Sequence, residues 1–403
     1  MDLNILVLAG GLASKDLSVL IPEGYNKVLL KIAGKPILCH VLQSLRKISK
    51  ARINLLYRRG EESVYREASR CVDEGLEPVV QESGYTVGEA IVSASSSLED
   101  SDKFMLVFGD LILDTRDLSQ VISTSLTEEH DAIVLAVPLD PRKASTHGLV
   151  VIDELGFVKK VYSSPPTGVV ENAYIAGGVY VLPTRILDFL EKGMDLPQAL
   201  DALATKSRVK AVNAEGEWVD VGSAKDLLRA TYIVLSRMHG IFIHEKATIE
   251  KTVVIKEPPI YVDEDAYIDH YAVIKGPVYI GKKSFIGVHS FIRDYSNVED
   301  NVRIGAFSEL RFSNIQSYVY IHSRVLLMDS VVGENTIIES NVTALNIPIE
   351  EEELPKTRSA MIKKPGIKVE KMGAVIGHDS KIGAGVLLKP GEIIREKSIV
   401  TKT

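Results

Sequence analysis

The chain has little of what would place it outside a reducing, aqueous compartment. Among 403 residues there are two cysteines, Cys39 and Cys71, too few for a disulfide framework, and both fall in helix-like patterns that predict inert core positions. No apolar run approaches the ~20 residues that span a bilayer. The first strand-like run follows Met1 almost at once, so no signal peptide fits. We expect a cytoplasmic protein with no membrane association.

The chain also lacks a strong charge of either sign. Its formal net charge is -7, which is mildly acidic and disfavours broad nucleic-acid binding through a positive field. Hydrophobic residues make up 45% of the sequence. At this length, that is enough for two domains, each with its own core.

Strand and helix patterns alternate through residues 1 to about 135. Such alternation predicts a mainly parallel sheet with helices on both faces, and ligands then bind at the carboxyl ends of the strands. From Asp131 to about Val212 the pattern becomes mostly strand, with a hairpin expected around Glu154-Leu155-Gly156. The expected strands are Leu3–Leu8, Ile53–Tyr57, Pro78–Val80, Met105–Phe108 and Ile133–Val137, and the expected helices are Pro36–Ile48, Glu61–Glu74, Glu89–Leu98 and Leu118–Ser125.

A glycine-containing turn follows the first strand. The apolar run stops at Ala9-Gly10-Gly11, and Lys15 and Lys27 follow within the next turns of chain. Glycines at such a place let the backbone approach a ligand closely, and successive free N–H groups there hold an anion. The alternative is a tight strand-to-helix turn on a Rossmann-like sheet, without a ligand.

The same stretch resembles the signature of the sugar-1-phosphate nucleotidyltransferases, L-A-A-G-x-G-T-R followed by P-K-x-L-x-x-V-x-G-K-P. The matching segments read LAGGLASK, residues 8–15, and NKVLLKIAGKP, residues 26–36. Ala13, Ser14 and Lys15 replace the family's glycine, threonine and arginine, and lysine keeps the charge without the planar fork. The resemblance implies that Ala9, Gly10 and Gly11 approach the nucleotide, that Lys15 balances the triphosphate charge, and that Lys27 stabilises the attacked phosphate.

Two aspartates match the family's metal ligands. Asp110 follows the strand MLVFG, and Asp220 lies in Trp218-Val219-Asp220-Val221-Gly222-Ser223, which matches the family's W-x-D-x-G-T/S. The resemblance implies that both carboxylates hold the catalytic Mg²⁺, an ion that takes one or two carboxylates together with phosphate oxygens and water. The alternative readings are an Asp that caps the next element and a Trp that merely ends a strand.

The base and sugar positions match less closely. Gln81 stands where the family's glutamine reads the pyrimidine of UTP or dTTP, but Thr86-Val87 replaces a Gly-Thr pair. Gly148 and Gly178 match family glycines beside the sugar. Three polar sugar contacts of the family are replaced by Ser163, Ser164 and Ala176. A different substrate, compensation by Lys159 or Lys160, or reduced activity follows from that change.

The rest of the chain carries a period-six repeat of aliphatic residues. Such a period, with turn residues between, is the signature of a left-handed parallel β-helix. We predict a nucleotidyltransferase domain at residues 1–222, a linker helix at 223–240 begun by Ser223 and Asp226, and the β-helix at 241–403. The repeat is expected to break from Leu310 until Ile376, with an exposed excursion at Asn346–Met372. The repeat positions are Ile243, Ile249, Ile255, Val262, Ile268, Ile274, Ile280, Ile286, Ile292, Val298, Ile304, Leu310, Ile376, Ile382, Leu388, Ile394 and Val400.

This layout resembles the two-domain archaeal and bacterial nucleotidyl-/acetyltransferases, whose β-helices usually pack as trimers. In the bifunctional members, a second site between β-helices transfers acetyl from acetyl-CoA to a sugar amine. The resemblance would place a histidine base at His322, basic groups at Arg293 and Arg311, and a lining residue at Asn346. The alternative is a β-helix that only oligomerises.

Together these patterns predict a Mg²⁺-dependent sugar-1-phosphate nucleotidyltransferase. It would take a nucleoside triphosphate, with UTP or dTTP favoured, and a sugar 1-phosphate, and it would release pyrophosphate and an NDP-sugar. A homotrimer is expected. The alternatives are a catalytically reduced paralogue that acts as a regulatory or assembly subunit, and a bifunctional enzyme that also uses acetyl-CoA.

Overall fold

The computed structural model describes residues 3–72, 74–99, 101–127, 130–139, 147–163, 171–347 and 371–402. The chain divides into two compact units. The first unit comprises Met1–Leu12, Glu23–Leu29 and Pro36–Val221, and the second comprises Ala13–Pro22, Leu30–Lys35 and Gly222–Thr403. Two short pieces of the signature stretch therefore belong, by their contacts, to the second unit.

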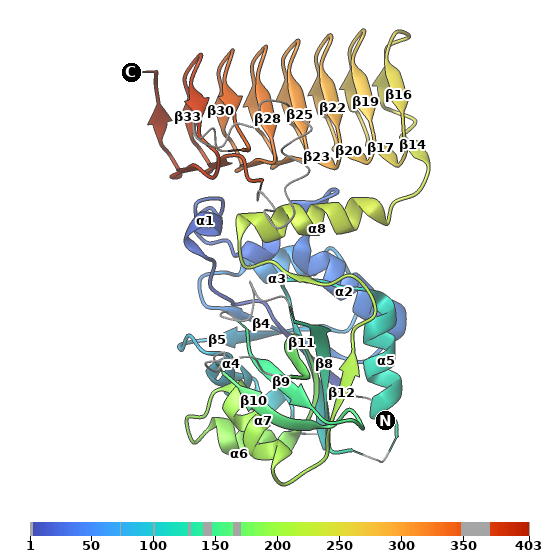
Figure 1. Cartoon of the computed structure of the whole chain (residues 1–403), viewed down its shortest axis with the longest axis vertical. Coiled ribbons are helices and arrows are strands. Elements are labelled where there is room, and N and C mark those ends of the chain that lie inside the picture. The colour runs from blue at the N-terminus through green and yellow to red at the C-terminus, as the bar shows by residue number, and fades with distance from the viewer. Residues whose placement is uncertain are drawn as a thin grey trace. The chain divides into compact units, whose positions relative to one another are not determined.

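The first unit is built on a nine-stranded mixed sheet, in which parallel and antiparallel strand pairs are equally frequent (Figure 1). Its strand order is β10-β9-β11-β6-β1-β4-β5, and β8 pairs with β11 and β12. The central strands β6, β1, β4 and β5 are parallel, whereas β11 runs antiparallel to β6, β8 and β9. The strands are β1 (Asn4–Leu8), β4 (Ile53–Arg58), β5 (Leu76–Gln81), β6 (Lys103–Phe108), β8 (Ala132–Pro138), β9 (Leu149–Ile152), β10 (Val158–Tyr162), β11 (Ala173–Pro183) and β12 (Val209–Asn213).

Helices cover both faces of this sheet, because alternate strand residues feed two separate cores. Ile5 and Val7 of β1 join a cluster with α2 and α5, while Leu6 joins the opposite cluster with α4 and α7. The predicted α/β class is confirmed. The helices are α2 (Ile37–Ile48), α3 (Ser63–Ala68), α4 (Val87–Ser93), α5 (Thr115–Ser125), α6 (Leu187–Leu190) and α7 (Leu196–Ala204), with single turns η1 (Lys27–Leu29), η2 (Ser95–Ser97) and η3 (Thr184–Ile186).

Two small strand pairs also lie outside the β-helix. Strands β7 (Leu111–Ile112) and β13 (Val219–Asp220) are antiparallel partners, and β2 (Lys31–Ile32) pairs with β3 (Lys35–Pro36). The expected hairpin is also present, since β9 and β10 pair antiparallel.

The two cysteines depart from the expectation of unlinked core residues. Cys39 in α2 and Cys71, shortly after α3, are joined by a disulfide, with their Cα atoms 5.5 Å apart. Helix packing rather than sequence spacing brings them together, since 32 positions separate them. The sequence pattern had treated each cysteine alone, so this pairing was missed.

The second unit is a left-handed parallel β-helix of three sheets (Figure 1). The first sheet holds β14 (Ile241–Ile243), β17 (Ile260–Val262), β20 (Val278–Ile280), β23 (Ser296–Val298), β26 (Asn314–Ile315), β29 (Val331–Val332), β32 (Val375–Ile376) and β35 (Ile393–Ile394). The second holds β15 (Thr248–Ile249), β18 (Tyr267–Ile268), β21 (Phe285–Ile286), β24 (Arg303–Ile304), β27 (Tyr320–Ile321), β30 (Ile337–Ile338), β33 (Lys381–Ile382) and β36 (Ile399–Val400). The third holds β16 (Val254–Lys256), β19 (Val273–Lys275), β22 (Phe291–Arg293), β25 (Glu309–Arg311), β28 (Leu326–Met328), β31 (Thr343–Ala344) and β34 (Leu387–Leu388).

The repeat residues from Val262 to Leu310 are fully buried and form one continuous cluster inside the β-helix. Glycine follows some of them because the next coil passes very close. A Cβ on Gly281 would lie 2.6 Å from the backbone carbonyl carbon of Glu299. The stacked coils thus bury their inner faces only against one another.

The predicted break after Leu310 was wrong in extent. The coils continue through Ile315, Ile321, Leu327, Val332, Ile338 and Ala344 without leaving the three sheets. Spacings of five residues, as from Leu310 to Ile315, interrupt the six-residue period while the coil still closes. Most of the expected excursion, residues 348–370, lies outside the described part of the chain.

The linker region begins as predicted with a capping box. Ser223 accepts a hydrogen bond from the N–H of Asp226, whose carboxylate accepts one in return, and α8 (Ala224–Ser236) follows. A short helix, α1 (Lys15–Ser18), also belongs to this unit. No helix among the described residues is long and apolar enough to cross a membrane.

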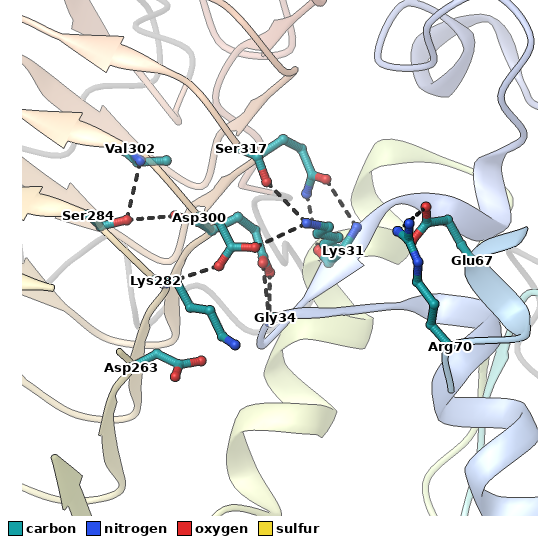
Figure 2. Close-up of polar contacts among 12 residues, drawn as sticks. Lys31, Gly34, Glu67, Arg70, Asp263, Lys282, Ser284, Asp300, Val302 and Ser317 are labelled. Carbon is teal, nitrogen blue, oxygen red and sulfur yellow. Dashed lines mark hydrogen bonds and ion pairs between the residues drawn. The ribbon is translucent and has the colours of Figure 1, made fainter. Parts of the chain in front are cut away.

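Residues 30–35 dock onto the β-helix through polar contacts (Figure 2). Lys31 Nζ lies 3.2 Å from Asp300 Oδ2 and 3.4 Å from Ser317 Oγ, and its backbone N–H donates to Gln316 Oε1 at 3.0 Å. The Gly34 N–H donates to the buried carboxylate of Glu299. The second unit therefore holds this piece of the signature stretch by backbone as well as by side chain.

Candidate active site

A cavity of the first unit opens at the carboxyl ends of its central parallel strands. It encloses about 590 Å³, counting open solvent at its mouth. This is the edge at which parallel α/β sheets bind ligands. The lining residues are Leu8, Gly10, Gly11, Leu56, Arg58, Gln81, Tyr85, Thr86, Val87, Ala90, Phe108, Asp110 and Asp220.

Asp110 and Asp220 meet in this cavity although 110 positions separate them in the chain. Asp110 comes two residues after the end of β6, and β7 follows it directly. Strand β13 pairs with β7 so that Asp220 lies opposite Leu111, and the Val221 N–H donates to the Asp110 carbonyl at 3.0 Å. The antiparallel pair thus brings the second carboxylate beside the first.

Each carboxylate has a basic partner. Lys27 Nζ lies 2.6 Å from Asp110 Oδ2, and the lysine side chain is only 7% exposed. His147 Nε2 lies 3.1 Å from Asp220 Oδ2. Burial raises the pKa of the Asp110 carboxyl above its ordinary value and the Asp220 charge raises it further, whereas Lys27 lowers it. Two close carboxylates in a buried site therefore repel each other, and Lys27 relieves only part of that repulsion.

The carboxylate pair fits Mg²⁺ in contact with a phosphate. Within the described ranges, no three His, Cys, Asp or Glu side chains gather into a complete metal cage. Mg²⁺ does not need one, since it is commonly held by one or two carboxylates together with substrate phosphates and water. A divalent cation held by Asp110 and Asp220 would also counter the smaller part of the pKa increase of Asp110, the part that the Asp220 charge causes beside burial.

The glycine turn lines the cavity, and a side chain would be crowded at Gly10 but not at Gly11. A Cβ on Gly10 would lie 3.1 Å from Arg58 Cγ, and one on Gly11 would lie 3.5 Å from Lys27 Cε. Asn26 fastens the turn, because its Nδ2 donates to the Gly11 carbonyl at 3.2 Å. The turn therefore links the end of the cavity that holds Lys27 and Asp110 to the end that holds Arg58.

Gln81 lies at this second end. It is the last residue of β5, is 4% exposed, and its Nε2 is buried with no hydrogen-bond partner among the described residues. Thr86, which stands in place of the family's Gly-Thr pair, caps α4 through a capping box with Glu89. The residue that replaces the expected motif thus has a local structural role.

The remaining predicted residues of the first signature and the sugar site are more scattered. Lys15 is exposed and begins α1 in the second unit. Gly178 has φ +74°, and a Cβ there would lie 3.0 Å from the Phe108 ring. Ser163 Oγ donates to Asp195 Oδ1 at 3.4 Å, while Ser164 lies outside the described residues. Gly148 precedes β9, and Ala176 lies in β11 opposite Ala136 of β8. Their roles stay predictions.

Of the four predicted acetyl-transfer residues, three lie at or just after the carboxyl ends of strands in the third β-helix sheet. Arg293 and Arg311 are in register on β22 and β25, and Asn346 donates to Asp329 at the same corner. His322 instead follows β27 of the second sheet, where its Nε2 lies 3.7 Å from Glu339 Oε2. Within one chain, the sheets separate the candidate base from the two arginines.

Three residues in or beside the cavity were not among the predicted site residues. Arg58, Tyr85 and His147 belong to none of the matched motifs, and each acquires its place only through strand pairing or a turn. Arg58 had one usable clue, since it directly follows the predicted strand Ile53–Tyr57 as Gln81 follows the predicted strand Pro78–Val80. His147 had none, because its partner Asp220 lies 73 residues away.

A strand-turn glycine loop, a buried lysine and two converging acidic residues on a parallel sheet define a nucleotide-binding transferase domain. Residues 4–237 match the family model described as Nucleotidyl transferase. The chain belongs to this family, and it is an enzyme of this kind.

Relatives match along nearly the whole chain. A bifunctional protein GlmU from Methanococcus aeolicus is 29% identical over 406 residues, covering 99% of this chain and 92% of that protein. One from Methanococcus maripaludis is 31% identical, covering 94% and 89%. A bifunctional sugar-1-phosphate nucleotidylyltransferase/acetyltransferase from Sulfurisphaera tokodaii is 26% identical, covering 91% and 88%. The two-domain layout is therefore shared with these proteins.

A solved structure supports the fold of the first unit. UDP-glucose pyrophosphorylase from Acinetobacter baumannii superposes with a TM-score of 0.52 at 20% identity, covering 59% of this chain and 95% of that one. At that identity the likeness concerns the fold alone.

Proposed function

We propose that the chain transfers a nucleotidyl group from a nucleoside triphosphate to a sugar 1-phosphate in a Mg²⁺-dependent reaction. The observation that carries this proposal is the meeting of Asp110, Asp220 and Lys27 at one cavity. The acceptor, a sugar 1-phosphate, is taken from the name of the Sulfurisphaera tokodaii relative.

The reaction is a displacement at the α-phosphorus. A phosphate oxygen of the sugar 1-phosphate forms a new bond to that phosphorus, the bond to the β-phosphate oxygen breaks, and pyrophosphate leaves with the electron pair. Such chemistry depends on positioning and on neutralising charge. Mg²⁺, when bound, would supply part of that neutralisation, and Asp110 and Asp220 are the residues that would hold it.

Other residues of the chain would approach the triphosphate, stabilise its charge and orient the carboxylates. Gly10 and Gly11 line the cavity without side chains, so a triphosphate could approach their backbone N–H groups closely. Lys27 is buried beside Asp110, so its charge acts in a low-dielectric site where it stabilises a negatively charged phosphate strongly. His147 orients the Asp220 carboxylate by its contact with Oδ2.

A pyrophosphate-release screen tests this proposal. The full chain with Mg²⁺ is mixed with each of UTP, dTTP, GTP, CTP and ATP and a panel of sugar 1-phosphates. We expect release with at least one pair, with UTP or dTTP favoured because Gln81 presents an amide at the base end. Absence of release across the whole panel, with nucleotide binding intact, would instead favour a regulatory or assembly subunit.

A second activity is favoured by one observation. The three relatives described above match over at least 91% of this chain and are named bifunctional, and one of these names includes acetyltransferase. Because Arg293 and Arg311 lie apart from His322 within one chain, an acetyl-CoA site would need neighbouring β-helices, as in a homotrimer. Acetylation of an amino-sugar phosphate that is lost in His322→Ala would establish it, and a monomer in solution would argue against it.

A further inference from the structure

Two buried hydrogen-bond donors lie side by side at the end of the cavity that holds Arg58 and Gln81. Arg58 ends β4 and Gln81 ends β5, and the two residues are direct partners in the parallel register. Arg58 Nε and Gln81 Nε2 are both buried, and neither has a hydrogen-bond partner among the described residues. Leaving a buried donor unpaired is unfavourable, so a ligand that brings acceptors to this place gains affinity.

The Arg58 side chain is held in place by its surroundings. Its guanidinium carbon lies 4.9 Å from the ring centre of Tyr85, and its Cγ packs against Gly10. The backbone of Tyr85 is held at this place, because its N–H donates to the Glu89 carboxylate at 2.8 Å. The Arg58 side chain therefore lies between the glycine turn and the Tyr85 ring.

The two ends of the cavity suit the two ends of a nucleotide. Lys27 and the aspartate pair at one end suit phosphates and their cation. The end with Arg58, Gln81 and the exposed ring of Tyr85 offers donors and an aromatic face, which suit a base. Apolar Leu8, Leu56 and Phe108 line the space they share.

We infer that Arg58 is a specificity-determining residue that selects, together with Gln81, a nucleotide with an oxo base. This inference rests on the proposed function only in taking a nucleotide as the ligand. Uracil and thymine present a carbonyl oxygen at position 4, and guanine presents one at position 6. In guanine the acceptor N7 is adjacent, and arginine commonly binds O6 and N7 together. Cytosine and adenine carry an amino donor at those positions, which would face the Arg58 and Gln81 donors unfavourably.

Equilibrium binding tests the inference without turnover. The full chain is titrated with UTP, CTP, GTP and ATP in the absence of sugar phosphate, and inorganic triphosphate is titrated as a base-free control. The UTP/CTP and GTP/ATP affinity ratios isolate the oxo-for-amino exchange in a pyrimidine and in a purine. We expect at least one ratio to exceed about tenfold, since one buried donor left unpaired changes affinity by that order.

The matched variant is Arg58→Lys, which keeps a positive charge but lacks Nε. We expect it to lower the oxo/amino ratio by about tenfold and to leave inorganic triphosphate binding within twofold. Tyr85→Leu, at a side chain that is 77% exposed, removes the ring under the guanidinium and should lower the ratio by a smaller factor without affecting folding.

Two results would overturn the inference. If Arg58→Lys and Tyr85→Leu both leave the ratios unchanged, Arg58 does not read the base. If Arg58→Lys weakens all nucleotides and inorganic triphosphate equally, Arg58 acts on phosphate. Selective binding without pyrophosphate release would contradict the proposed function while leaving this inference in place.

Discussion

Replacing Glu299 by Gln should remove a large part of the pH dependence of the second unit's stability. Glu299 follows β23, is fully buried, and accepts hydrogen bonds at Oε1 from Asn297 Nδ2 at 2.9 Å and from the Gly34 N–H at 3.2 Å. Gln has an oxygen that keeps these two bonds, and it loses the second contact of the Gly34 N–H, at 3.1 Å from Oε2. The substitution therefore removes the titration and leaves most of the packing.

The magnitude follows from the shifted pKa. Burial raises the pKa of Glu299 from its ordinary 4.5 to about 7, against the lowering effects of Asn297 and Lys31, and the nearby Asp300 charge raises it further. A raised carboxyl pKa means that the folded state binds the proton more tightly than the unfolded state. The stability contribution is then present at low pH and declines as the pH rises from 4.5 to about 7. Between pH 5.5 and 8.5 that loss amounts to about 2 kcal/mol.

Urea unfolding of the wild type and Glu299→Gln at pH 5.5, 7 and 8.5 measures this difference. Far-UV circular dichroism follows both units, and Trp218 fluorescence reports the first unit separately because Trp218 is the chain's single tryptophan. The wild type should lose about 2 kcal/mol of unfolding free energy between pH 5.5 and 8.5 through Glu299, and the variant should not show this loss. Glu245→Gln, at an exposed position of the same unit, is the control and should change nothing. Parallel pH profiles for wild type and Glu299→Gln would refute the reasoning.

Three further substitutions probe other contacts. Gly34→Ala places a Cβ against the Tyr279 hydroxyl at a residue with φ +77°. It should lower the free energy of urea unfolding of the second unit by about 1–3 kcal/mol. A loss under about 0.5 kcal/mol would contradict the docking of residues 30–35. Trp218→Phe leaves the Gly177 carbonyl without the indole N–H that now donates at 3.0 Å, so it should cost about 1–3 kcal/mol in thermal unfolding of the first unit, whereas an unchanged transition would mean the bond contributes little. Lys27→Met should slow pyrophosphate release by about 10² or more, and a wild-type rate would exclude Lys27 from the chemistry.

The fold could be predicted from local patterns because each pattern repeats under one physical constraint. Alternation of buried residues in β1 separates two cores, and the six-residue period fills the inside of the β-helix. The period failed after Leu310 because a coil can close with one residue fewer, as between Leu310 and Ile315, while its inner aliphatic residue stays buried. A strict spacing rule cannot detect that adjustment.

The candidate site also contains residues that local sequence patterns predict and residues that they do not. Gly10, Gly11, Asp110 and Asp220 could be predicted because their motifs have a fixed order and the strand ends bring them to one edge. Arg58 and His147 could not, since what matters for them is contact in space with residues far away in the chain.

The disulfide between Cys39 and Cys71 and the docking of Lys31 onto the β-helix depend on tertiary packing for the same reason. No local pattern in the sequence encodes either contact.

The central claim is that Asp110 and Asp220 act together on a Mg²⁺-bound triphosphate. The most direct test is the rate of pyrophosphate release, with saturating Mg²⁺, for the wild type, Asp110→Asn and Asp188→Asn, the last an exposed aspartate of α6. The account predicts a loss of about 10² or more in Asp110→Asn and a wild-type rate in Asp188→Asn. A steady rate in Asp110→Asn equal to that of the wild type would contradict it.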